Sequence, residues 1–196
     1  MKQQKNWQRK QNEITTGQQH REQANPKEKE PQQTSLLGET LYLLRKVLVI
    51  VVLLALCGIW LFGTARNTDL GMMPAVKSGD LIFYYRLDKQ YVASDLVAVK
   101  IDGRFQTWRV VAVGGDTVDL TDQGLMINGY FQQEEDIVGE TLPYTDGISF
   151  PITLKENQVF LLGDNRENAS DSRLYGAVDV EDTLGKVVAI LRRRNL

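Results

Sequence analysis

One uninterrupted apolar run dominates the hydrophobic pattern of the chain. Residues 47–65, VLVIVVLLALCGIWLFGTA, contain no charged side chain. A helix of this length, rising about 1.5 Å per residue, nearly spans a hydrocarbon layer of about 30 Å. A buried soluble helix would need apolar partners on every side, and the rest of the chain offers no such surface. We therefore predict a transmembrane helix over residues 45–65.

The residues before this run are polar. Residues 1 to about 34 are rich in Gln, Lys and Glu, with Trp7 and Ile14 as their only large apolar side chains. Such a composition cannot build a core, so we predict a disordered tail over residues 1–44. Basic residues precede the apolar run, which predicts a cytoplasmic tail and a single-pass plasma-membrane protein whose C-terminal domain is extracellular.

Two processing signals lie inside the apolar run. Cys57 follows Leu-Ala-Leu, as in a lipoprotein signal, and Gly63-Thr-Ala65 has the small-x-small pattern of a cleavage site. The residue before Cys57 is the bulky Leu56, and the preceding tail is far longer than the start of a secretory signal. We expect an uncleaved anchor in contact with membrane lipid, with Cys57 as an ordinary apolar residue.

Beyond Arg66 the pattern changes to short β-type runs separated by Gly-Asp and Asn-Gly turns. Asn128-Gly129 is the strongest hairpin signal. No segment with helical periodicity is long enough to cover a parallel sheet. Residues 66–196 therefore predict a mainly β domain that is antiparallel and partly closed. The expected strands are 81–85, 96–99, 108–113, 117–120, 125–127, 158–162 and 186–191.

Composition narrows the possible functions. The net charge of -2 argues against nucleic-acid binding, and a single Cys excludes an intramolecular disulfide. The only His, His20, lies in the polar tail, so the chain lacks the histidines for a His-based triad or a His-rich metal site. We expect neither a metal nor another cofactor.

Four stretches, in this order, resemble the sequence boxes of type I signal peptidases, the S26 family. They are Gly71-Met-Met-Pro74, Ser78-Gly-Asp-Leu-Ile-Phe83, Arg109-Val-Val-Ala-Val-Gly-Gly-Asp-Thr-Val118 and Gly163-Asp-Asn-Arg-Glu-Asn-Ala-Ser-Asp-Ser-Arg-Leu-Tyr-Gly176. The resemblance implies two antiparallel β regions with a substrate groove, and cleavage of exported preproteins by a Ser-Lys dyad. In that mechanism a serine attacks the carbonyl and a neutral lysine takes its proton.

The residues that the resemblance assigns to this chemistry differ from the family pattern. Gly71 takes the place of the nucleophilic serine, and Trp108, which cannot accept a proton, takes the place of the lysine. Ala169 falls on the lysine-orienting serine. Asp69 falls on the hydroxyl that assists the oxyanion, where a carboxylate would repel the developing charge. The resemblance thus predicts that the chain has no catalytic residue.

Other residues could in principle take over. Lys77 and Ser78 are adjacent, but neighbouring side chains on an extended chain point apart. Lys100 precedes an Asp-Gly turn and is expected to be a solvated surface charge. Ser170 could replace the hydroxyl missing at Ala169 only after a local shift.

The remaining residues of the boxes have expected binding or structural roles. A groove could grip a peptide as an added strand, with pockets for small side chains, or Trp108 could fill the cleft. The expected groove residues are Asp69, Leu70, Gly71, Met72, Met73, Pro74 and Trp108. The expected structural residues are Gly79, Asp80, Arg109, Asp116, Gly163, Asp164, Asn165, Arg166, Asp171, Ser172, Arg173 and Gly176.

Two functions follow from these patterns. In the first, the chain is a non-catalytic binding or assembly factor, similar to the signal-peptidase-like proteins of Gram-positive pilus gene clusters, with an exported protein or pilin subunit as its partner. In the second, it is an active signal peptidase whose catalytic groups lie elsewhere in the chain.

Overall fold

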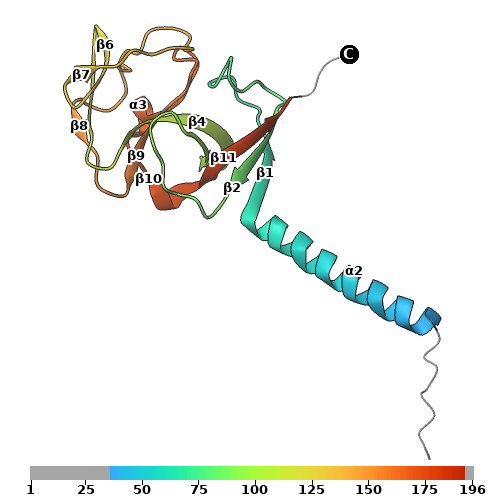
Figure 1. The fold of residues 1–196 in the computed structure, drawn as a ribbon. Coiled ribbons are helices and arrows are strands. Elements are labelled where there is room, and N and C mark those ends of the chain that lie inside the picture. Colours follow the sequence, from blue (N-terminus) through green and yellow to red (C-terminus); the bar gives the residue numbers. More distant parts are fainter. Residues whose placement is uncertain (1–35, 193–196) are drawn as a thin grey trace, which may run out of the picture. The chain divides into compact units, whose positions relative to one another are not determined.

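A long apolar helix precedes the β domain. The computed structural model describes residues 36–192 (Figure 1). Helix α2 runs over Leu36–Leu61 with a mean hydropathy of 2.4 in its most apolar window and no buried residue. By length and composition it could cross a membrane. It begins before the expected start at residue 45, because residues 36–44 are mostly helix-forming leucines. The rest of the expected disordered tail lies outside the described residues.

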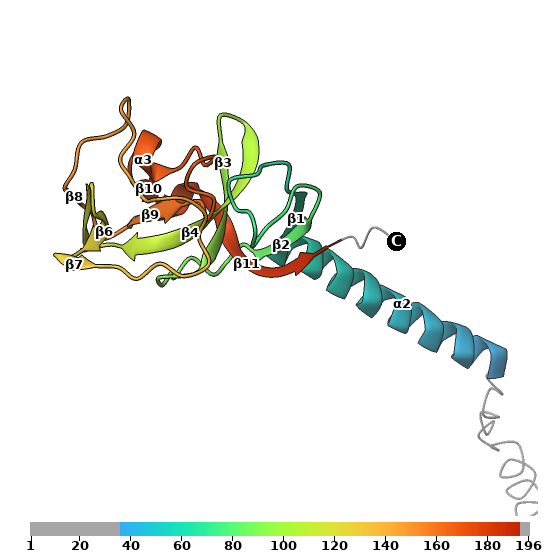
Figure 2. The ribbon, with the colours of Figure 1, turned by 90° about the horizontal axis from the view of Figure 1, so that it is seen from above.

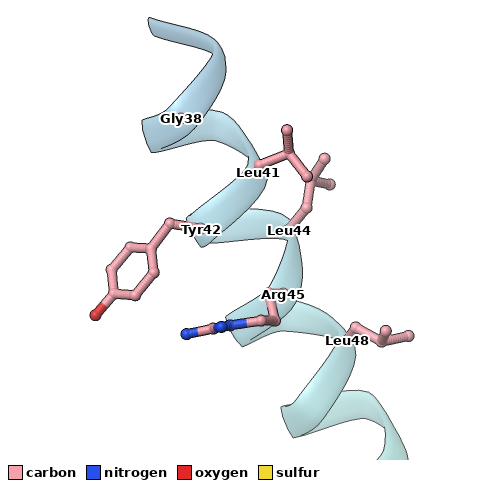
Figure 3. A pocket seen from close by; sticks show the side chains of 6 residues that line it. All are labelled: Gly38, Leu41, Tyr42, Leu44, Arg45 and Leu48. Carbon is pink, nitrogen blue, oxygen red and sulfur yellow. The ribbon is translucent and has the colours of Figure 1, made fainter. Parts of the chain in front are cut away.

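The first half of α2 combines aromatic and basic side chains at one level. Figure 3 shows a shallow hollow along the helix lined by Gly38, Leu41, Tyr42, Leu44, Arg45 and Leu48. Both Arg45 and the neighbouring Lys46 lie over the Tyr42 ring, at 5.7 and 4.4 Å from its centroid. Amphipathic aromatic and basic side chains of this kind are typical of the boundary between lipid and water.

The expected end of the helix at residue 65 is wrong. Strand β1, Phe62–Arg66, follows Leu61 directly and pairs antiparallel with β2, Leu81–Tyr85. The lack of charge in residues 62–65 suggested helix, but Gly63 is a poor helix former that packs here against the Tyr84 ring. The small-x-small sequence Gly63–Ala65 is therefore part of a sheet.

The domain is built from two antiparallel sheets, as the sequence predicted. The larger has the order β1-β2-β11-β3-β4-β9-β10 and the smaller the order β7-β6-β5-β8. In Figures 1 and 2 the β6–β7 hairpin lies at the end of the domain remote from β1 and β2. The other elements are β3 Leu96–Ile101, β4 Arg104–Val113, β5 Thr117–Thr121, β6 Gly124–Ile127, β7 Tyr130–Phe131, β8 Ile152–Thr153, β9 Gln158–Leu162, α3 Ser172–Tyr175, β10 Val178–Asp179, a short 3-10 helix at Val180–Asp182 and β11 Thr183–Leu191.

Two hydrophobic clusters stabilise this arrangement, and β9 divides them. Val159 and Leu161 belong to the first cluster, whereas Phe160 and Leu162 belong to the second. Successive side chains of a strand point to opposite faces, so one strand supplies both cores. Strand β4 contributes to both as well, because its register with β9 shifts between Val110 and Ala112.

Candidate functional site

The segment from Asn67 to Asp80 forms a closed loop between β1 and β2. Its ends are joined by hydrogen bonds from Asn67 N to Asp80 O at 2.9 Å and from Gly79 N to Asn67 O at 2.7 Å. The buried Asn67 side chain donates from Nδ2 to the carbonyl oxygens of Asp69 and Lys77. These bonds hold residues 69–74, which include the first box, in a fixed course.

Gly71 and Ala169 lie side by side although they are far apart in the sequence. A Cβ placed on Gly71 would lie 3.1 Å from Ala169 Cα and 3.3 Å from Ala169 Cβ. The Gly71 carbonyl accepts a hydrogen bond from Asn165 N at 2.9 Å, which joins the two segments. The structure thus brings together the residues predicted at the nucleophile and base-orienting positions.

The Asp69 carboxylate accepts a hydrogen bond from the main-chain N–H of Gly71, beside Ala169. Its Oδ1 accepts from Leu70 N at 2.6 Å and from Gly71 N at 3.1 Å, and its Oδ2 lies 3.4 Å from where a Gly71 Cβ would be. An oxyanion would need that N–H for itself. The Gly71 N–H instead donates to a carboxylate.

Trp108 belongs to the core. Its side chain is 0 % exposed and shares a cluster with Met72, the neighbour of Gly71. The indole stacks on Tyr175 of α3, with ring centroids 6.4 Å apart and planes 16° apart. Its Nε1 has no hydrogen-bond partner within the described residues. Trp108 therefore fills the space inside the core. A groove residue must be exposed, so the expected role of Trp108 in a groove is wrong.

The other expected groove residues are divided between core and surface. Gly71 and Met72 are buried, Asp69 and Met73 are half-buried, and Leu70 and Pro74 are exposed. Leu70 keeps 51 % of its surface exposed. Leu70 and Pro74 therefore offer the most accessible surface for a peptide at this segment.

A network of arginines and carboxylates fixes the loop after β9. Arg109 donates from Nε and Nη2 to the two oxygens of the buried Asp164, both at 2.7 Å. These hydrogen bonds, opposed by partial burial and assisted by the Asp164 and Asp136 charges, raise the pKa of Arg109. Asp164 N in turn contacts Met72 Sδ at 3.4 Å. The loop is thus tied to β4 and to the first box.

Asp171 and Arg173 form a second, fully buried pair. Arg173 Nε and Nη2 donate to Asp171 at 2.9 and 3.0 Å, and Asp171 Oδ2 also accepts from Gly163 N. Asp171 caps the N-terminus of α3, as a short polar side chain does well. Arg173 reaches the Arg166 carbonyl at 2.6 Å and lies 4.3 Å from the Tyr144 ring centroid. A buried charge needs such partners on every side.

Residues 132–149, to which the sequence assigned no role, also stabilise the loop after β9. Glu134 pairs with the buried Arg166 at 2.6 Å, and Thr141 accepts a hydrogen bond from the same guanidinium. Tyr144 Oη donates to Ala169 O at 2.5 Å, and its burial raises the pKa of its phenol. Nothing in the local pattern of residues 132–149 distinguishes these three from loop residues, since their partners are distant in sequence.

Family comparison identifies the scaffold to which these residues belong. The family model for signal peptidase, peptidase S26, matches residues 40–192. The chain belongs to this family.

The chain is similar to several signal peptidases and processing peptidases. It is 28% identical over 156 residues to signal peptidase I of Bacillus licheniformis, covering 72% of this chain and 82% of the relative. Thylakoidal processing peptidase 1 of Arabidopsis thaliana is 38% identical over 80 residues, 41% of this chain and 22% of its own length. A solved signal peptidase I from Enterococcus faecalis has 24% identity and a TM-score of 0.42, covering 50% of this chain and 97% of that one.

The serine and lysine side chains considered as replacements for a signal peptidase dyad lie on the surface. Lys77, Ser78, Lys100 and Ser170 are all exposed. Within residues 36–192 the hydrogen bonds of lysine side-chain amines reach no serine hydroxyl. Lys89 instead donates to a backbone carbonyl, and Lys186 pairs with Asp95.

The remaining box residues hold turns of the signal peptidase domain. Arg192 donates to the buried Asp80, whose carboxylate also accepts from Lys77 N at 2.9 Å. Asp116 accepts from Val113 N, and Ser172 Oγ from Leu161 N. Gly79 and Gly176 have φ of 92° and 85°, where other residues are strained.

Proposed function

We propose that this protein is a membrane-anchored signal peptidase-like protein without peptidase activity, which binds exported surface proteins such as pilins and assists their assembly. In this proposal α2 is an uncleaved single-pass anchor, with the N-terminus in the cytoplasm and the β domain outside the plasma membrane. The observation that supports it best is the cluster of Gly71, Asp69 and Ala169. These three residues supply no hydroxyl for a serine-type attack, and the Gly71 N–H already donates to Asp69.

The chemistry explains why hydrolysis is excluded in this proposal. A glycine has no group to attack a carbonyl, and an indole accepts no proton. Asp69 adds a negative charge beside the place where an oxyanion would form, and it holds the Gly71 N–H. Proteases deprived of nucleophile and base lose most of their rate and retain only what binding and oxyanion contacts provide.

A cleavage assay tests the loss of activity. The detergent-solubilised full chain is incubated with an exported preprotein beside the Bacillus licheniformis signal peptidase I. We expect cleavage slower by a factor on the order of 10⁴ or more, because nucleophile and base are both missing. Cleavage that Lys77→Ala or Ser78→Ala abolishes would overturn the proposal.

The same assay can rebuild the site in steps. Gly71→Ser with Trp108→Lys is expected to stay inactive, since the lysine lacks an orienting hydroxyl and Asp69 still holds the N–H. Adding Ala169→Ser supplies the orienting hydroxyl, and adding Asp69→Ser frees the N–H of residue 71. Activity should appear only when both are added. Full activity in the double variant would show that the added hydroxyls are unnecessary. Thermal unfolding of each variant controls for loss of the buried indole.

The second candidate function is an active signal peptidase. The family match and the curated relatives named signal peptidase I favour it. The assay above separates the two functions.

The partner is tested by co-purification. The tagged full chain is solubilised from cells that express a candidate pilin, beside a Leu70→Ser, Pro74→Ser variant, which changes the exposed part of the first box. Binding to the parent chain with loss in the variant supports the proposal. Equal recovery with both chains would place the contact elsewhere, and no recovery would remove the pilin as partner.

A further inference from the structure

The charges of the domain are unevenly distributed. Residues 110–154 contain eight acidic side chains and no basic one: Asp116, Asp119, Asp122, Glu134, Glu135, Asp136, Glu140 and Asp146. In the rest of the β domain, residues 62–109 and 155–192, twelve acidic and twelve basic residues balance. The stretch forms the smaller sheet and the segments around it, so the net negative charge is concentrated on one part of the domain.

Two large aromatic side chains are exposed on the same part. Tyr130 is 76 % and Phe131 53 % exposed, and together they make up strand β7. Phe131 pairs in register with Met126, which pairs with Asp119, so the three side chains lie on one face of the sheet. Asp122 and Glu135, close by in the sequence, are exposed. Tyr130 precedes Phe131 in the strand, so its side chain points to the opposite face of the sheet. We name Asp119, Met126 and Phe131, together with the nearby exposed Asp122 and Glu135, the acidic aromatic face.

Strand β7 also has an open edge. It ends the smaller sheet and pairs only with β6. Gln132 N bonds to Leu125 O, and Asn128 and Gly129, with φ of 53° and 83°, form the turn before Tyr130. Main-chain bonds alternate between the two sides of an antiparallel strand, so Phe131 directs its N–H and C=O away from β6. An added extended segment could bond there.

We propose that the acidic aromatic face docks an extended, basic segment of a partner protein. On the face of Phe131, lysine or arginine side chains of the added strand would meet Asp119, Asp122 and Glu135. Its alternate side chains, on the opposite face, would be apolar and lie against Tyr130. A second copy that met this face with its own acidic aromatic face would bring the same negative charge and be repelled. An anionic lipid surface would be repelled for the same reason. Charge complementarity thus selects a basic protein segment.

The surface shares no residue with the cluster of Asp69, Gly71 and Ala169, so the proposal does not depend on the proposed function. The outcome of the cleavage assay therefore leaves it unchanged.

Fluorescence anisotropy of a labelled peptide, Lys-Val-Lys-Val-Lys-Val-Lys, with the detergent-solubilised full chain tests the docking. We expect the peptide to bind, and its affinity to fall as the salt concentration rises. The corresponding Glu-Val peptide should not bind. Tyr130→Ser with Phe131→Ser, and separately Asp119→Asn with Asp122→Asn and Glu135→Gln, should each weaken binding at least about 10-fold, which corresponds to about 1.4 kcal/mol.

The matched control neutralises three exposed acidic residues elsewhere: Asp102→Asn, Glu156→Gln and Asp182→Asn. It should leave binding unchanged. Equal weakening in this control would reduce the effect to overall charge and overturn the proposal, as would unchanged binding in the charge variant of the face. If the aromatic variant fails to unfold cooperatively, the charge variant decides alone. Binding of phosphatidylglycerol vesicles, or self-association, that requires Phe131 would replace the proposed partner by lipid or by a second copy.

Discussion

At the residue scale, the main chain of Gly71 is engaged on both sides. Its N–H donates to Asp69 and its carbonyl accepts from Asn165. Two polar groups that could bind a peptide are thereby satisfied within the domain. The most exposed side chains of this segment, Leu70 and Pro74, offer a partner apolar contacts, which are less directional than main-chain hydrogen bonds.

Sequence reasoning reached part of this cluster. Matching the boxes assigned residues 71 and 169 to two roles in one catalytic site, and the structure brings them side by side. The hydrogen bond from Gly71 N to Asp69 could not be predicted, since it depends on one side-chain torsion. The complete burial of Trp108 was left open for a similar reason. A bulky aromatic can line a groove or fill it, and only packing decides.

Asp80 is the residue whose ionisation we expect to affect stability most clearly. Burial alone raises the pKa of its carboxyl, but hydrogen bonds from Arg192 and Lys77 N and the charges of both residues together lower it. The folded state therefore binds the proton less readily than the unfolded state. The stabilisation is complete above the ordinary pKa of about 3.9 and is lost as the pH falls through the lower, folded-state pKa.

Asp80→Asn should therefore lower stability by about 1–3 kcal/mol at neutral pH and reduce its loss in acid. Chemical unfolding of the solubilised protein between pH 7 and pH 2 measures both effects. Asp102→Asn, in an exposed turn with φ of 50°, removes a charge without removing such partners and serves as the control. An unchanged acid profile in the Asp80 variant would contradict the assignment.

At the scale of elements, alternation of apolar and polar residues predicted the strands well. Strands β2 and β9 have the expected bounds, and the other long strands are found with shifted ends. The short strands β7, β8 and β10 were missed, because two residues carry no period. Strand β1 was missed because lack of charge does not distinguish a membrane helix from a strand that continues it.

The contact between β1 and β2 gives a test of that boundary. Gly63 lies against the Tyr84 ring, so an added Cβ would collide with it. Gly63→Ala should destabilise the β domain by about 1–3 kcal/mol, as overpacking does, measured by thermal unfolding in detergent. Gly58→Ala in α2, where an added Cβ meets nothing within 4 Å, is the matched control.

Replacing Tyr84 by Leu in the Gly63→Ala background should recover part of the loss, since the colliding ring is gone. If Gly63→Ala unfolds at the parent temperature, β1 does not pack on β2 in the way described. The same pairing bears on processing. A protease would have to draw residues 63–65 out of the sheet before cleaving after them.

At the scale of the whole molecule, the two hydrophobic cores could be predicted from the sequence, whereas the polar network between distant segments could not. The two cores meet at β9, whose neighbouring residues face opposite ways. That division could be expected from a run of apolar residues in a strand buried on both faces. The buried network of Arg166, Arg173 and Tyr144 could not, because it joins segments that no local pattern connects.

The occupied N–H of Gly71 also bears on inhibition. Compounds that acylate a serine and place their oxygen in the vacant donor site of a hydrolase would find here neither an atom to bond nor a free donor. If the chain lacks peptidase activity as proposed, such compounds should label an active signal peptidase in the same membrane and leave this chain unlabelled. Drugs aimed at secretion would then spare this chain, and blocking it would require molecules that cover its surface.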